Sequence, residues 1–339
     1  MRNAIIVAGV VVVAAGAFLY VSKTTPPNTS APAASKSSVA TYTYKVDSYL
    51  DLPEGRKWGP VTAMDFAPDG QSMWVVDRCT EMGDCSPNAE PGPIQQFNAT
   101  GRRMTSFGAG LFAAPHGMFV DHDGNVYVTD FRLKDGKGST VMKFDPEGKL
   151  LLTLGKPGEM GHDETLLNGP ADVVVAQNGD IFVADGHAEK DAFPRIVKFD
   201  KDGKFIKAWG QPGKGPGEFG TPHSIMIDSE GHVLVCDRGN FRIQVFDQDG
   251  NYLRELKSFM DPSAIAIDNN GVLYAFDMSS VEKDGSNDRR GIYIGDPKTD
   301  KLTGFMKNDD MLEDLAIDSA GTVFAGSNAK KTFNRIVRE

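Results

Sequence analysis

The sequence predicts an all-β protein, a six-bladed β-propeller closed by a strand from the N-terminal part of the chain. The first observation is a phrase repeated six times: an apolar strand, a turn glycine and a second apolar strand that usually ends in an acidic residue. Many copies continue into a third strand, such as "RIVKFD", and a fourth, such as "FIKAWG". About 40–55 residues with four short strands per repeat is typical of a propeller. The turn glycines are Gly70, Gly124, Gly179, Gly231, Gly271 and Gly321.

The second observation is that the last repeat is incomplete. After Gly321 come "TVFAG" and "RIVRE", so a fourth strand is missing. Residues 42–52 read "YTYKVDSYLDL" and alternate as a strand does. Pairing this segment with the blade that contains Arg335–Arg338 would close the ring and remove an exposed edge. The propeller is therefore predicted over residues 42–339.

Composition agrees with this fold and excludes one class of function. The chain has 37 Gly and 19 Pro, as expected for short strands joined by turns. Its formal net charge is −10 and it has no long basic run. Nucleic-acid binding is therefore excluded as a predicted function. We expect a monomer that acts on a small anionic or peptide-like substrate.

The N-terminal segment predicts export. In residues 1–23, Arg2 precedes an apolar run over residues 4–21, which is typical of a signal peptide. At roughly 18 residues the run also reaches the lower limit of a membrane-spanning helix, so a cleaved signal and a retained anchor both stay open. Residues 24–41 are rich in Pro, Ser and Ala and are predicted to be a tether. In either case the propeller is expected in the periplasm or outside the cell, with a possible membrane tether.

Three cysteines are present. Cys79 and Cys85 enclose a short loop, and in an exported protein they could either form a local disulfide or stay reduced. Cys236 lies on a predicted inner strand between Val235 and Asp237 and is expected to be a buried free thiol.

The repeat register predicts which side chains meet in the central channel. The innermost strand of each blade lines this channel, and equivalent positions lie at equal height. Blades two, four and six, which are about 120° apart, carry His116, His223 and Glu313 at the position eight residues before the turn glycine. Three protein ligands with open positions suit catalytic zinc, and two histidines with a carboxylate also suit non-haem iron. The full set at this position is Thr62, His116, Ala171, His223, Ser263 and Glu313.

The remaining histidines fall elsewhere in the repeat. His122, His162 and His232 belong to turns or loops away from this ring and are predicted to be surface residues. Asp314 follows Glu313 and points the other way along the strand. It could hold a second, structural cation such as Ca²⁺, or it could accept hydrogen bonds from backbone N–H groups at the end of the channel.

The second strands predict the mouth of the channel. They end in Asp77, Asp130, Asp185, Asp237 and Asp277, which we expect to brace turns. The residues that follow should line the mouth on the metal side, among them Arg78, Arg238 and Gly186–His187. Two arginines at equivalent corners indicate an anionic ligand, because guanidinium binds carboxylate in a bidentate manner; the alternative is two Arg–Asp pairs within loops. The arginines of the repeated "RI" are expected to be structural: Arg195, Arg242 and Arg335.

"PHGM", "VADGH…RIVKF", "PHSIMID" and "CDRGNFRIQVF" resemble NHL-repeat propellers. More narrowly, they resemble peptidyl-α-hydroxyglycine α-amidating lyase (peptidylamidoglycolate lyase) over about residues 50–339. The resemblance implies a six-bladed propeller with zinc held by three histidines, two of which match His116 and His223. It also implies a structural calcium at Asp314 and active-site arginines at Arg78 and Arg238.

Two positions depart from that family. Glu313 stands where the family has its third histidine, and His187 stands where it has a catalytic tyrosine. A carboxylate can ligate zinc, and histidine can act as a base at neutral pH. The resemblance therefore implies a metal at His116, His223 and Glu313 and a carboxylate clamp of Arg78 and Arg238. His187 would act as the base, or as a fourth ligand.

Three functions compete at this point. The first is a metal-dependent lyase that cleaves the C–N bond of a carbinolamide to give an amide and glyoxylate. The second is a non-catalytic exported propeller that binds a protein or a small ligand. The third is a hydrolase of the lactonase type with a divalent metal and carboxylate-rich ligation. The histidine pair at equal register favours the lyase, and the two departures favour the binding module.

Overall fold

The computed structural model describes residues 39–47, 50, 57–80, 83–85, 91–187, 191–278 and 289–338. Every described residue belongs to one compact unit, Ala33–Glu339. The predicted signal or anchor and nearly all of the predicted tether lie outside the described residues. Within the described part, no helix has the length and apolar character needed to cross a membrane.

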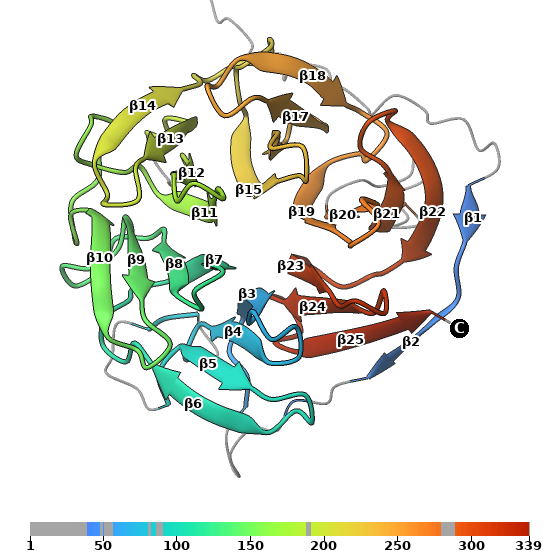
Figure 1. Ribbon diagram of the computed structural model, residues 1–339, viewed down its shortest axis with the longest axis horizontal. Coiled ribbons are helices and arrows are strands. Elements are labelled where there is room, and N and C mark those ends of the chain that lie inside the picture. Colours follow the sequence, from blue (N-terminus) through green and yellow to red (C-terminus); the bar gives the residue numbers. More distant parts are fainter. Residues whose placement is uncertain are drawn as a thin grey trace, which may run out of the picture. The chain divides into compact units, whose positions relative to one another are not determined.

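Within the described residues, six sheets surround a central channel, which confirms the predicted propeller (Figure 1). The four strands of each blade are antiparallel. The innermost strands are β3 (Val61–Phe66), β7 (Pro115–Val120), β11 (Pro170–Val175), β15 (Thr221–Ile227), β19 (Pro262–Ile267) and β23 (Leu312–Ile317). The second strands are β4 (Met73–Asp77), β8 (Val126–Asp130), β12 (Ile181–Asp185), β16 (Val233–Arg238), β20 (Leu273–Asp277) and β24 (Val323–Ser327).

The outer half of each blade follows the same order. The third strands are β5 (Ile94–Phe97), β9 (Thr140–Phe144), β13 (Arg195–Phe199), β17 (Arg242–Phe246), β21 (Gly291–Asp296) and β25 (Phe333–Arg338). The fourth strands are β6 (Arg103–Phe107), β10 (Leu150–Gly155), β14 (Phe205–Trp209), β18 (Tyr252–Leu256), β22 (Lys301–Lys307) and, in blade six, β2 (Tyr44–Asp47).

The ring closes as predicted. β2 pairs antiparallel with β25, from Tyr44 opposite Arg338 to Asp47 opposite Arg335. Arg335 binds Asp47 through Nε at 2.9 Å and Nη2 at 2.8 Å. The N-terminal strand therefore supplies the fourth strand that the last repeat lacks (Figure 1).

The chain adds one pairing that the sequence did not predict. β1 (Ala40–Thr41) lies parallel to β22 and forms a fifth strand on blade five. Tyr42, between β1 and β2, packs on Gly304, where an added Cβ would lie 2.1 Å from the Tyr42 ring. The guanidinium carbon of Arg338 lies 3.5 Å from the centre of the same ring. Tyr42 therefore ties the outer edges of blades five and six together.

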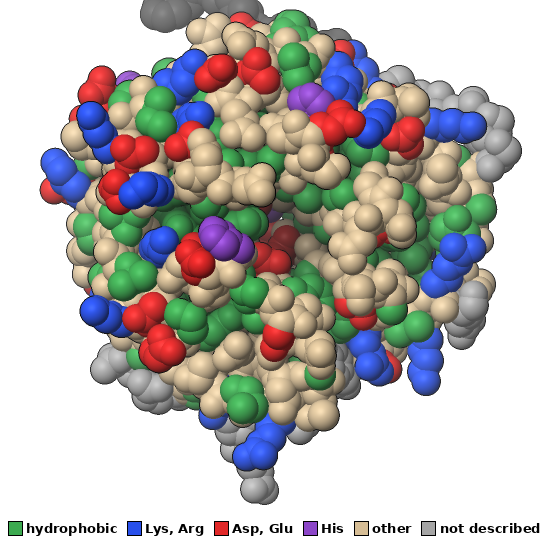
Figure 2. All heavy atoms as spheres, in the orientation of Figure 1, with side chains coloured by type: hydrophobic (Ala, Val, Ile, Leu, Met, Phe, Trp, Pro, Cys, Tyr) green, Lys and Arg blue, Asp and Glu red, His purple; other side chains and the backbone are tan. Residues whose placement is uncertain are grey.

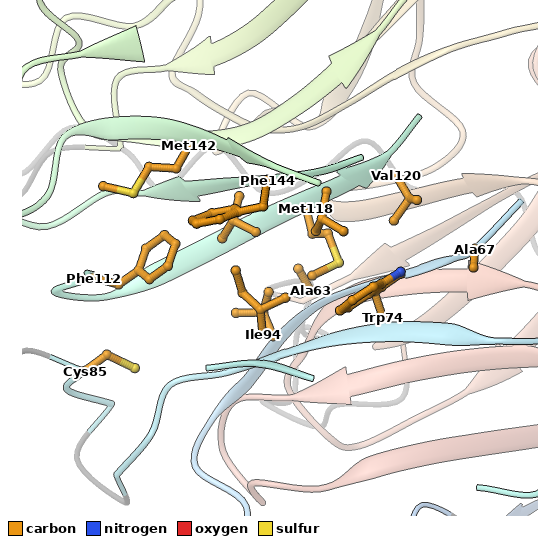
Figure 3. Close-up of a cluster of buried hydrophobic side chains, with 13 residues drawn as sticks. Ala63, Ala67, Trp74, Cys85, Ile94, Phe112, Met118, Val120, Met142 and Phe144 are labelled. Carbon is orange, nitrogen blue, oxygen red and sulfur yellow. The ribbon is translucent and has the colours of Figure 1, made fainter. Parts of the chain in front are cut away.

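The apolar core lies between neighbouring blades. Figure 3 shows Trp74, Ile94, Met118 and Phe144 pointing toward one another between blades one and two. Phe107 links two of them, with ring centres 5.3 Å from Trp74 and 5.2 Å from Phe144. Because these contacts fill the space between sheets, the channel is left to polar side chains. Figure 2 shows one face of the propeller, where acidic side chains lie beside a hollow at the centre.

Every innermost strand is irregular near its start, and this irregularity creates the site. The pairing register shifts once in each, for example between Pro115 and Met118 and between Pro222 and Ile225. A β-bulge of this kind re-aims side chains out of the ladder. The residue eight positions before the turn glycine lies inside the shift in all six blades. The bulges thus explain why the ring of equal register faces the channel.

Candidate functional site

His116 and His223 are held alike by the blade that follows each of them. Their Nδ1 atoms lie 2.9 Å from the carbonyl oxygen of Ala171 and 2.7 Å from that of Ser263. A carbonyl oxygen only accepts, so each Nδ1 carries the hydrogen and each Nε2 presents its lone pair. Gly117 permits the first contact, because a Cβ there would lie 2.5 Å from the Ala171 oxygen. Orientation by a backbone carbonyl is common for histidines that bind metals.

A third histidine completes the group from a different part of its blade. His187 follows β12, and its backbone N–H donates to the Gly169 oxygen at 2.8 Å. The preceding Gly186 has φ 123°, and a Cβ there would lie 2.4 Å from the Pro194 Cα. Only glycine therefore fits the turn that brings His187 to the channel.

The three imidazoles form a nearly equilateral triangle. Their ring centres are 4.9 Å apart for His116 and His223, and 5.1 Å apart for both pairs that include His187. One ring nitrogen from each lies within 4.8 Å of the other two, which is the arrangement of a possible metal site. The sequence named His187 as a base or fourth ligand, whereas the structure groups it with the histidine pair.

Glu313 lies beside this triangle. Its Oε2 is 3.6 Å from the His223 Nε2, and the Asn328 side chain donates to its Oε1 at 2.6 Å. Within the described part of the chain, three buried atoms here have no hydrogen-bond partner: His187 Nδ1, His223 Nε2 and Glu313 Oε2. Buried polar atoms without partners are costly. Imidazole nitrogen is a ligand of zinc, so the unpartnered lone pair of the His223 Nε2 fits a divalent ion of this kind.

The electrostatics keep the histidines neutral near pH 7. Burial lowers the pKa of His116 and of His223 well below the ordinary value, and it lowers that of His187 to about 3. The Arg238 cation lowers the His187 pKa further. Neutral imidazole is the form that binds metal. The three imidazoles are therefore uncharged near pH 7 before any ion is bound.

The two predicted arginines, Arg78 and Arg238, line a cavity of about 400 Å³ together with His116, His187 and Glu313. Arg78 is buried; its Nε donates to the Pro115 oxygen at 2.9 Å, and its guanidinium carbon lies 5.0 Å from the centre of the Phe131 ring. Burial lowers the Arg78 pKa to about 10, so it remains a cation at neutral pH. The Arg238 Nη2 lies 2.9 Å from the His187 Nε2. Three arginines and one glutamate line the cavity, a charge balance that suits an anionic ligand.

Known proteins agree with this fold and with the resemblance. Residues 161–329 match a family model described as a 6-bladed beta-propeller. Peptidyl-glycine alpha-amidating monooxygenase B of Xenopus laevis is 34% identical over 255 residues, covering 69% of this chain and 28% of that protein. A probable peptidyl-alpha-hydroxyglycine alpha-amidating lyase of Caenorhabditis elegans is 41% identical over 198 residues, covering 57% of this chain and 50% of that protein. The chain is a six-bladed propeller that is similar to an amidating lyase and to an amidating monooxygenase.

The similarity covers only part of these relatives. The matched segment spans about a quarter of the Xenopus protein and half of the Caenorhabditis protein. A solved putative gluconolactonase has a TM-score of 0.60 and 13% identity, covering 89% of this chain and 94% of that protein. At that identity the likeness concerns the fold alone.

Additional residues lie at the mouth of the channel. Phe131, Arg132, Thr221 and Asn328 line the cavity together with the predicted residues. The repeat could have predicted two of them, because Phe131 and Asn328 directly follow a second strand, at the same position as Arg78. Phe131 is apolar, and blade six ends its second strand in Ser327 rather than aspartate. Neither residue therefore resembled a ligand in the sequence.

The residues expected to be structural are in structural positions. Asp130 accepts from the N–H groups of Ala113 and Ala114 at 2.8 and 2.7 Å. The Nε atoms of Arg195 and Arg242 bind Asp185 and Asp237 at 2.9 and 2.8 Å.

The other histidines lie away from the site: His122 and His162 are exposed, and His232 is paired with Asp228. Cys79 and Cys85 form a disulfide, and Cys236 is a buried free thiol.

Asp314 joins two blades. Its Oδ2 accepts from the Met64 N–H of blade one at 2.8 Å. Asp65 and Asp172 likewise each reach the following blade, accepting from Val120 at 2.8 Å and from Ile225 at 2.9 Å. Asp314 therefore accepts a backbone N–H group, as one of the two sequence interpretations expected. The calcium ion stays a prediction.

The burial of Asp65 leads to a testable pH dependence. Burial raises its pKa from 3.8 to about 7, so folding favours the protonated form. The contribution of Asp65 to the free energy of unfolding is therefore largest below about pH 4, and it is lost as the pH rises through about 7. Relative to Asp65→Asn, the wild-type free energy of unfolding should fall by up to about 4 kcal/mol between pH 4 and pH 8. Urea unfolding at both pH values measures this, and parallel pH profiles for the two proteins would show that Asp65 does not titrate as described.

Proposed function

We propose that this propeller is an exported, metal-dependent lyase that cleaves carbinolamides ending in α-hydroxyglycine. The observation that carries the proposal is the triangle of His116, His187 and His223. Two of these histidines, His116 and His187, line a cavity together with Arg78 and Arg238. The similarity to a protein named as a probable amidating lyase supports the same reaction. The Cys79–Cys85 disulfide supports export, because disulfides are typical of oxidising compartments.

The reaction breaks one C–N bond. In the substrate, R–CO–NH–CH(OH)–COO⁻, the hydroxyl loses its proton and its electron pair forms the carbonyl of glyoxylate. The C–N bonding pair moves to nitrogen, which takes up a proton and leaves as the amide R–CO–NH₂. Atoms and charge balance without an oxidant or a second substrate.

His116, His187 and His223 would hold the ion in this proposal. When bound, zinc or a similar divalent ion supplies Lewis acidity that lowers the pKa of the substrate hydroxyl. The His187 Nε2 now accepts from Arg238, and one lone pair cannot serve both an arginine and a metal. Taking His187 into the ligand set through Nε2 would free the Arg238 guanidinium for the substrate carboxylate.

Arg78 and Arg238 would orient the substrate, and Glu313 would accept the hydroxyl proton. The Glu313 Oε2 is buried and without a partner among the described residues, and it lies 3.6 Å from the His223 Nε2. A base must lie within hydrogen-bond reach of the proton that it takes, and this carboxylate borders the ligand triangle. The proposal exchanges the roles that the sequence suggested, with His187 as a ligand and Glu313 as the base.

Metal analysis tests this proposal against the binding-module alternative. After dialysis against metal-free buffer and reloading with Zn²⁺, we expect about one tightly held ion per chain, because three neutral histidines converge on one point. Reloading with Co²⁺ should give the visible absorption of a four-coordinate site, with three protein ligands and one water or substrate ligand. Protein that retains no stoichiometric metal would favour a non-catalytic propeller. Turnover of a lactone in preference to a carbinolamide would favour the hydrolase.

A further inference from the structure

The chain turns sharply directly after each of the two arginines that line the first cavity. In blade four, Gly239 follows Arg238 and has φ 82°. In blade one, the residue at the same position is Cys79, which follows Arg78 and has φ 56°. Glycine adopts positive φ at little cost, whereas a residue with a Cβ rarely does. The turn after Arg78 is therefore one that its own residue type disfavours, and another contact must hold it.

The turn at Cys79 is tight and is tied to a buried residue. The Thr80 N–H donates to the Arg78 carbonyl oxygen at 2.5 Å, which closes a three-residue turn around Cys79. Such a γ-turn with positive φ is rare and strained. The disulfide links Cys79 to Cys85, which is only 1% exposed and whose N–H donates to the Ala113 oxygen at 2.9 Å. Because strained turns persist only where the surrounding structure holds them, this link explains how Cys79 keeps its conformation.

The loop that the disulfide closes also contacts the side chain of Arg78. Gly83 lies within this loop, and an added Cβ there would be 3.5 Å from the Arg78 Cδ. The head of the same side chain is held by blade two: its Nε donates to the Pro115 oxygen at 2.9 Å, and its guanidinium carbon lies 5.0 Å from the centre of the Phe131 ring. A shift of the loop would therefore change where the guanidinium points.

We propose that the Cys79–Cys85 disulfide is a positioning element for the substrate: it fixes the turn at Cys79 and thereby holds the Arg78 guanidinium in the cavity. The matching turn in blade four needs no such link, because Gly239 adopts positive φ freely and its N–H donates to the Asp261 Oδ1 at 2.6 Å. This inference rests on the proposed lyase function and adds a pair of residues that act through Arg78.

Two paired substitutions test the proposal. The serine variant, Cys79→Ser with Cys85→Ser, removes the link and leaves a residue with a Cβ at the turn. The glycine variant, Cys79→Gly with Cys85→Ser, removes the link but copies the turn of blade four. With metal-loaded protein and α-hydroxyhippurate as substrate, the serine variant should raise KM about tenfold, as loss of a hydrogen bond to a charged group does, and keep its zinc and its kcat. The glycine variant should stay within about threefold of the wild-type KM, because glycine adopts the turn freely.

A purely structural disulfide would give a different pattern. Both variants would then melt at a lower temperature than the wild type with KM unchanged, and this result would overturn the proposal. A glycine variant with the same rise in KM as the serine variant would overturn it too, because the turn at Cys79 would not be what positions Arg78.

Combination with arginine variants shows which arginine the disulfide positions. In the Arg78→Ala background the serine variant should cause no further rise in KM, whereas in the Arg238→Ala background the rise should again be about tenfold, because only coupled sites deviate from additivity. Equal rises in both backgrounds would contradict the proposal. The control is Met104→Gln, on the exposed outer strand β6 of the same blade, which should leave KM unchanged.

Hydrogen exchange at the Arg78 Nε–H separates failure of this inference from failure of the reaction. The resonance is assigned by its absence from Arg78→Lys. Because the group is buried and bound to Pro115, its exchange should be slow in the wild type and the glycine variant, and about tenfold or more faster in the serine variant. That result supports the positioning role even if no carbinolamide is cleaved. Equal exchange in the wild type and the serine variant, or fast exchange in the glycine variant, overturns it whatever the turnover.

Discussion

Glu313→Gln is expected to keep the metal and lose about 10²–10³-fold in kcat, as removal of a general base does. His187→Ala is expected to lose both the metal and the activity, because two histidines hold zinc far less tightly than three ligands do. The difference arises because His187 belongs to the ligand triangle, whereas Glu313 lies at its side with an unpartnered oxygen.

Zinc content after dialysis and steady-state kinetics on the same samples measure both effects. His122→Ala is the matched control, since this side chain is 82% exposed and lies away from the channel. The opposite pattern, with metal lost from Glu313→Gln and retained by His187→Ala, would contradict the assignment. It would restore the arrangement suggested by the sequence, in which Glu313 is a ligand and His187 is the base.

Arg238→Ala is expected to raise KM for α-hydroxyglycine substrates by about tenfold or more. Loss of a hydrogen bond to a charged group costs about 1.5–3 kcal/mol, and Arg238 lines the cavity beside the histidines. Arg242→Ala should instead lower stability by about 2–4 kcal/mol and spare KM. Arg242 is buried and binds Asp237 at 2.8 Å and Glu255 at 3.0 Å.

Kinetics and thermal melts on the two variants distinguish the roles of these neighbouring arginines. Arg238 stands at a corner of the mouth, and Arg242 stands in the repeated third strand. An unchanged KM in Arg238→Ala, or an equal rise in both variants, would show that Arg238 does not hold the substrate carboxylate.

Much of the fold could be predicted from the sequence because each repeat corresponds to one blade of the propeller. The six turn glycines fixed the number of blades, and the missing last strand indicated closure by residues near Tyr44. The two-residue strand β1 carries no periodic signal. Its place depends on packing between Tyr42 and Gly304, residues far apart in the sequence. Such a contact cannot be seen in a local pattern.

Only the site residues that lie at equivalent positions of the repeated strands could be predicted to meet in the channel. His116, His223 and Glu313 share one register position, and the bulge at that position turns all three to the channel. His187 comes from the loop after β12, so register could place it at the mouth but could not set its distance from the pair. That distance depends on the turn at Gly186 and on the bond from His187 N–H to Gly169.

The most direct measurement is glyoxylate release by wild-type protein loaded with one equivalent of zinc. With α-hydroxyhippurate as substrate, we expect glyoxylate and benzamide in equal amounts, at a rate that falls at least tenfold after chelation and recovers when zinc is restored. Metal-loaded protein that releases no glyoxylate above the uncatalysed rate would contradict the lyase account. The cavity would then have to serve a different reaction or bind a ligand without cleaving it.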